Sequence, residues 1–196
     1  MGEISEIVLP RADPERLAGA VRGVLTEQGE RAPTLVTGLV PPASALRAGA
    51  AASVRGGSVD LDLARYFQAL LELGYLVASA DGLADSEREA LAALLEQVSG
   101  DAVDRQTLLT HFRDLDQASE VLGRRERLVR VAAHFGDEPS RLEAIGFAAL
   151  VAMADGTLDR SEMEALVDLG ARFGMNARQI DLEVRAIARR VEERLR

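Results

Sequence analysis

The chain lacks cysteine, lysine and tryptophan, and its 196 residues include only two tyrosines and five phenylalanines. Without cysteine it can form no disulfide bond, thiolate metal site or cysteine nucleophile. Without lysine it can form no Schiff base and has no lysine for a phosphate-binding loop. Because aromatic side chains are scarce, the core must be built from Leu, Val, Ala and Ile, which suits closely packed helices.

Basic charge is also in deficit, because 32 Asp and Glu outnumber 23 Arg and give a net charge of −9. This balance disfavours nucleic acids and anionic membrane surfaces as partners, and it leaves a cation or a basic protein surface. The N-terminus shows no signal-peptide pattern, and the longest uncharged helical stretch, residues 144–154, is too short to span a bilayer. We therefore expect a cytoplasmic protein that does not insert into a membrane.

From about residue 60 to the end, apolar residues recur at intervals of three and four, which predicts helices throughout. The fold class predicted is all-α, a compact bundle of about seven helices over residues 60–196. Two of them carry no charge on any face at 73–80 and 144–154, so we expect them to be buried at the centre. The breaks in the pattern place the helices at 62–80, 85–98, 103–115, 119–135, 138–154, 160–173 and 177–195.

Residues 1–59 differ in composition and are predicted to form an N-terminal extension. Asp13, Pro14 and Glu15 are typical of a helix start, and a helix is expected from residue 14 to about 28. The β-branched run at 34–40 indicates either a short strand or a packed extended segment. The Ala- and Gly-rich residues 43–57 indicate a helical turn that continues into a flexible linker.

The phrase Ala-Asp-Gly occurs twice, at residues 80–82 and 154–156, each time between an apolar helix and a helix with an acidic start. This repeat predicts a duplicated helix–turn–helix unit related by a pseudo-two-fold axis. It also places carboxylates at two equivalent turns, and these are the candidate metal-binding residues: Asp81, Asp85, Glu87, Asp155, Asp159 and Glu162.

Two interpretations of these turns remain open. In the local one, each Gly adopts the left-handed conformation, each Asp accepts backbone N–H groups, and Asp85 and Asp159 cap the next helices. In the other, the acids bind a cation, since the second copy matches the second half of an EF-hand loop. Val151 and Met153 replace the first two carboxylates of such a loop, and the first copy is one residue shorter. We therefore expect a looser oxygen-ligand site for Ca²⁺ or Mg²⁺, formed by one turn or both.

Other candidate chemistry is weaker. His111 and His134 accompany no sequence pattern of a catalytic triad, and each is interpreted as structural or surface-exposed. The duplicated acids look alike, whereas a catalytic pair needs contrasting environments, so no enzyme is expected. Arg-rich segments at 124–130 and 185–196 are interleaved with Glu, which indicates salt-bridged solvated faces, or else a docking surface for an acidic partner.

The chain resembles the TerB-like family, named for tellurite-resistance proteins, over residues 60–195. The two Ala-Asp-Gly turns, the helices between them and the Gly174-Met175-Asn176 junction before the last helix carry the resemblance. The resemblance implies an all-α fold of about seven helices with internal pseudo-symmetry, in proteins associated with tellurite and other chemical stress. It also implies that acids at the turns form metal or partner sites, at positions matched here by Asp81, Glu87, Asp155 and Glu162.

We therefore expect a bacterial, non-enzymatic TerB-like module that acts by interaction or sensing in a stress-response or membrane-associated complex. A protein partner is expected, a homodimer is one allowed assembly, and Ca²⁺ or Mg²⁺ is the candidate cofactor. The alternative is a ligand-free scaffold protein that acts through its N-terminal segment or its Arg-rich last helix.

Overall fold

A computed structural model of the chain describes residues 6–31, 58–98 and 103–196. These residues are almost entirely helical, with two very short strands, so the predicted all-α fold class is confirmed. The elements in chain order are β1 (Ile7–Val8), α1 (Pro14–Arg31), α3 (Ser58–Ala78), α4 (Asp85–Val98), α5 (Arg105–Leu122), α6 (Arg124–Ala132), α7 (Glu138–Ala152), the 3₁₀ turn η1 (Met153–Asp155), β2 (Thr157–Leu158), α8 (Arg160–Arg172) and α9 (Ala177–Leu195).

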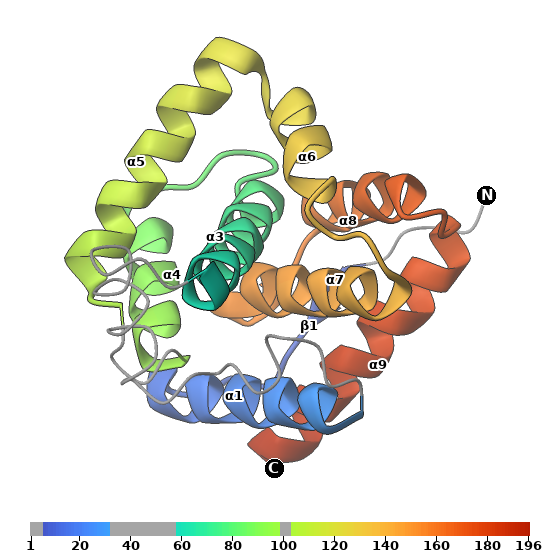
Figure 1. Cartoon of the computed structure of the whole chain (residues 1–196). Coiled ribbons are helices and arrows are strands. Elements are labelled where there is room, and N and C mark those ends of the chain that lie inside the picture. The colour runs from blue at the N-terminus through green and yellow to red at the C-terminus, as the bar shows by residue number, and fades with distance from the viewer. Residues whose placement is uncertain (1–5, 32–57, 99–102) are drawn as a thin grey trace.

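The helices α3 and α7 lie at the centre, and the other helices surround them (Figure 1). Residues 73–78 and 144–152 are buried on every face, as the absence of charge predicts. The two helices approach closely where Gly74 meets Val151, since a Cβ on Gly74 would lie 3.0 Å from the Val151 Cγ2 atom. The small residues of the two uncharged segments therefore allow the central contact of the bundle.

The helix α1 packs against α9 and α4, and its buried residues Leu17, Val21 and Val24 belong to the same core cluster as α3 and α7. Its predicted start is confirmed, because the Asp13 carboxylate accepts the backbone N–H of Arg16 at 2.9 Å. The predictions for residues 34–40 and 43–57 lie outside the described residues.

The predicted break between the two helices at 103–115 and 119–135 is wrong. The helix α5 continues through residues 116–118 and ends at Gly123, whose φ of 81° belongs to the left-handed region. Asp116 is held in the middle of this helix by a 2.7 Å hydrogen bond from the Tyr75 hydroxyl. The segment 116–118 contains no residue that ends a helix, whereas Gly123 adopts the required conformation at little cost.

A two-stranded antiparallel pairing joins the start of the chain to the second Asp-Gly turn, and the helical pattern gave no indication of it. Ile7 lies opposite Leu158 and Val8 opposite Thr157. Strands of two residues are too short for an alternating pattern to be read from the sequence. None of the helices in the described ranges is long and apolar enough to cross a bilayer.

Candidate functional site

The two Asp-Gly turns have the same backbone form. Gly82 and Gly156 have φ angles of 100° and 94°, in the left-handed region that glycine adopts readily. The Gly82 N–H donates to the Ser79 carbonyl at 3.2 Å, and the Gly156 N–H donates to the Met153 carbonyl at 3.0 Å. The predicted role of glycine as the left-handed residue after each central helix is confirmed.

The helices that follow the turns begin with equivalent bonds but different residues. At α8, the Asp159 carboxylate accepts the Glu162 N–H at 2.8 Å, and the Glu162 carboxylate accepts the Asp159 N–H at 2.9 Å. This is a complete capping box. At α4, the Glu87 carboxylate accepts the Ala84 N–H at 2.8 Å. The residue that precedes α4 is therefore Ala84, which has no side chain able to cap the helix.

The prediction that Asp85 caps α4 is wrong. Asp85 is the first residue of the helix, and its fully exposed side chain forms an ion pair with Arg88 at 2.8 Å. Because the first turn is one residue shorter than the second, the capping position falls on Ala84. The shortening therefore removes a capping acid, but it leaves Glu87 and Glu162 at equivalent positions.

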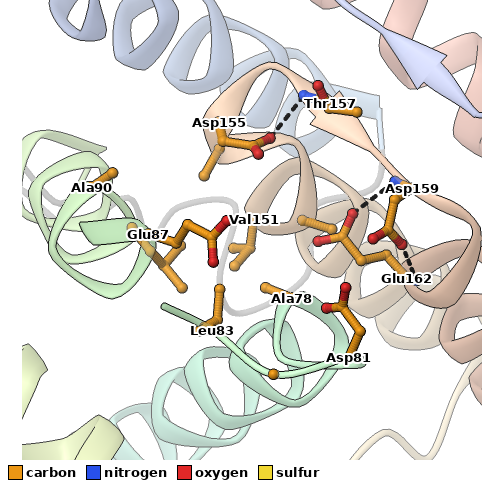
Figure 2. A pocket seen from close by; sticks show the side chains of 14 residues that line it. Ala78, Asp81, Leu83, Glu87, Ala90, Val151, Asp155, Thr157, Asp159 and Glu162 are labelled. Carbon is orange, nitrogen blue, oxygen red and sulfur yellow. Dashed lines mark hydrogen bonds between the residues drawn. The ribbon is translucent and has the colours of Figure 1, made fainter. Parts of the chain in front are cut away.

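Five of the six candidate carboxylates line one pocket between the two turns, with a volume of about 240 Å³. In Figure 2, side chains from the first turn, the second turn, α4 and α8 surround a common space beside Val151 and Ala78. Asp85 is the sixth candidate and does not line this pocket. The lining residues are Ala78, Asp81, Gly82, Leu83, Glu87, Ala90, Leu91, Val151, Ala152, Ala154, Asp155, Thr157, Asp159 and Glu162.

The aspartates of the two turns differ in their hydrogen bonds. The Asp155 carboxylate accepts the Thr157 N–H at 2.8 Å, so the local interpretation holds for this residue. Within the described part of the chain, the Asp81 carboxylate accepts no hydrogen bond. Its charge instead interacts with the guanidinium of Arg124 at the start of α6 and with Glu162 across the pocket.

Glu162 is the buried acid of the pocket. Only 9% of the residue is exposed, and this burial raises its pKa to about 8. The negative charges of Asp159, Asp155 and Asp81 raise the pKa further, while the hydrogen bond from the Asp159 N–H lowers it. Glu162 is therefore mostly protonated at neutral pH. The expectation that the duplicated acids are alike is wrong, because Glu87 is exposed.

As the side chains stand, no group of three or more Asp, Glu or His residues in the described ranges could hold a metal ion directly. The pocket lining contains no Ser or His, and Thr157 supplies its only hydroxyl group. Neither histidine lines it. His134 is exposed, and burial lowers the pKa of His111, whose Nε2 atom is buried without a hydrogen-bond partner in the described residues.

A family comparison agrees with the two-turn architecture. The chain matches the model of the family described as "Tellurite resistance protein TerB" over residues 67–183. It belongs to the TerB family. The match begins in α3, ends in α9 and includes both Ala-Asp-Gly turns, whereas β1 and α1 lie outside it. No curated protein and no solved structure is significantly similar to the chain.

The Arg-rich segments of this TerB-family chain form ion pairs with the interleaved acids, as the sequence predicts. Most of these pairs are exposed and lie along one helix, an arrangement typical of a solvated face. The pairs within α6 and α9 are Arg130–Glu126, Arg185–Asp181, Arg190–Glu183 and Arg196–Glu192, while Arg127 pairs with Glu72 of α3 and Arg194 with Glu27 of α1.

Proposed function

We propose that this TerB-family chain is a non-enzymatic interaction or sensing module of a chemical-stress response, and that its acidic pocket takes up a divalent cation. One observation carries the proposal. Carboxylates from two turns about 75 residues apart in the sequence line a single pocket. Each turn could hold its own backbone without this convergence, so the local interpretation does not account for it.

Electrostatics supports a cation in this pocket. The raised pKa of Glu162 indicates that acids are crowded there without a compensating positive charge. Asp81 accepts no hydrogen bond from the described residues, so its carboxylate is free to act as a ligand. Uptake of a cation would relieve the repulsion between the acids and would favour the ionised form of Glu162.

The chemistry of the lining favours Ca²⁺ or Mg²⁺. All charged groups in the pocket are carboxylates, and hard divalent cations prefer oxygen ligands. Because no three acids are close enough for direct coordination, the ion would retain water molecules between itself and the carboxylates. A cation with six waters needs about 200 Å³ at ~30 Å³ per water, which the pocket volume of about 240 Å³ accommodates.

Thermal unfolding tests the cation. We expect Ca²⁺ or Mg²⁺ to raise the melting temperature over that measured in EDTA, since a ligand of the folded state stabilises it by RT ln(1 + [L]/Kd). Asp155→Asn should weaken this response, because the amide retains the oxygen that accepts the Thr157 N–H but loses the charge. Asp85→Asn is the matched control outside the pocket and should respond as the wild type does. Indifference of the wild type to millimolar Ca²⁺ and Mg²⁺ would refute the cation site.

Growth under stress tests the biological role. A bacterial strain that lacks this gene is complemented with the wild type, Asp155→Asn or Asp85→Asn, and growth is measured across a tellurite series. We expect the wild type and Asp85→Asn to restore tolerance and Asp155→Asn to restore less. Equal growth with an empty vector would contradict a role in this stress.

A further inference from the structure

The N-terminal strand holds the second Asp-Gly turn from outside the pocket. The Leu9 N–H donates to the Gly156 carbonyl at 2.7 Å, and the pairing continues from Val8–Thr157 to Ile7–Leu158. Residues 7–9 thus follow the backbone between Asp155 and Asp159. In the described ranges no strand pairs with the first turn.

This pairing fixes backbone that serves the pocket directly. The Thr157 N–H donates to the Asp155 carboxylate at 2.8 Å, so the position of this backbone determines where the carboxylate lies. Asp159, the next pocket residue, directly follows the paired strand. Leu9 is 6% exposed and Leu158 is fully buried, so burial of both apolar side chains anchors the strand pair in the core.

We propose that β1 positions the acidic pocket, with Leu9 as the anchoring residue, so that docking of residues 7–9 and uptake of a divalent cation strengthen each other. The second half of this proposal rests on the proposed function. If docking of β1 raises cation affinity, the cation must stabilise the docked strand by the same factor. The strand lies outside the family match at 67–183, so part of this TerB-family pocket is positioned by the chain's own extension.

Substitution of Leu9 in the full chain tests the positioning. Leu9→Ala removes the anchor, Leu9→Met retains an apolar side chain of similar volume, and Leu195→Ala makes a comparable deletion at a 5% exposed residue in the last turn of α9. In metal-free protein we expect faster amide hydrogen exchange at Thr157 and Leu158 in Leu9→Ala only. We also expect Ca²⁺ to bind Leu9→Ala on the order of tenfold more weakly, and Leu9→Met and Leu195→Ala as the wild type.

Two further outcomes separate the proposals. Wild-type exchange at Thr157 in Leu9→Ala, together with an affinity equal to that of Leu195→Ala, overturns the positioning role and leaves the cation site standing. A wild type that binds neither Ca²⁺ nor Mg²⁺ refutes the proposed function, while exchange in metal-free protein still decides the positioning. Should Leu9→Ala not fold, the reciprocal effect is measured in the wild type. Saturating Ca²⁺ must then slow exchange at Leu9, and an unchanged rate overturns the coupling.

Discussion

Glu87 and Glu162 accept the same hydrogen bond in different surroundings. Each carboxylate binds the backbone N–H three residues earlier, at 2.8 Å for Glu87 and 2.9 Å for Glu162. Glu87 is exposed, whereas only 9% of Glu162 is. Because the bonds are alike, burial rather than local geometry accounts for the raised pKa of Glu162. The duplication therefore supplies one accessible acid and one enclosed acid to the same pocket.

The stability of the metal-free protein should depend on the protonation of Glu162. Its pKa rises from 4.5 to about 8 on folding, so the folded chain binds the proton more tightly than the unfolded chain. The resulting stability is complete below about pH 4.5 and is lost as the pH rises through about 8. We expect the free energy of unfolding of the wild type, relative to Glu162→Gln, to fall by up to ~1.4 kcal/mol per pH unit in this window. Urea unfolding in EDTA at several pH values measures it.

Glu87→Gln is the matched control for this prediction. It removes a carboxylate from the equivalent helix position, but the side chain is exposed. Its stability should follow pH with the slope of the wild type. If Glu162→Gln also retains the wild-type slope, Glu162 is not the buried acid that we infer.

The two aspartates at the helix starts should differ in their contribution to stability. Asp159→Ala removes the cap of α8 and should cost about 1 kcal/mol of unfolding free energy. Asp85→Ala loses only an exposed ion pair with Arg88 and should cost a few tenths of a kcal/mol. Urea unfolding of both variants at one pH gives the comparison. Equal costs would mean that Asp85 caps α4 after all.

The sequence was sufficient for the helical fold and for the central position of α3 and α7. Uncharged helix faces must be buried, and the Ala-Asp-Gly repeat marks where both central helices end. The same repeat located the pocket, because equivalent turns after two neighbouring helices are carried to the same end of the pair. These features depend on local periodicity and on burial, which a sequence expresses directly.

Three features were beyond the sequence pattern. The β1–β2 pairing joins residues about 150 positions apart through strands of two residues, which leave no alternation to detect. The break at Gly123 was placed too early because Asp116 faces Tyr75 and Arg88, so its charge does not mark a helix end. The burial of Glu162 depends on how α7, α8 and the turns pack, and the local sequence around Glu87 is nearly the same.

Gly74→Ala tests the close approach of the central helices. The added methyl group would lie 3.0 Å from Val151, whose branched side chain has little rotational freedom in a helix. Overpacking should outweigh the gain in helix propensity of up to ~1 kcal/mol, so we expect net destabilisation of about 1–2 kcal/mol. Gly19→Ala in α1 is the control, since nothing lies within 4 Å of its Cβ position. Gly19→Ala should stabilise the protein in urea unfolding, and equal stabilisation by Gly74→Ala would contradict the tight contact.

Cation uptake should release protons at neutral pH. With a pKa of about 8, Glu162 carries a proton at pH 7 that it must lose before the carboxylate can face a bound cation. We expect close to one proton released per chain near pH 7 and almost none well above pH 8. Below the pKa, Ca²⁺ affinity should rise with pH by up to about tenfold per unit. Calorimetric titration in two buffers of different ionisation enthalpy measures the released protons, and Glu162→Gln, which has no proton to lose, should release almost none. Identical heats for the wild type in both buffers at pH 7 would show that the cation does not displace this proton.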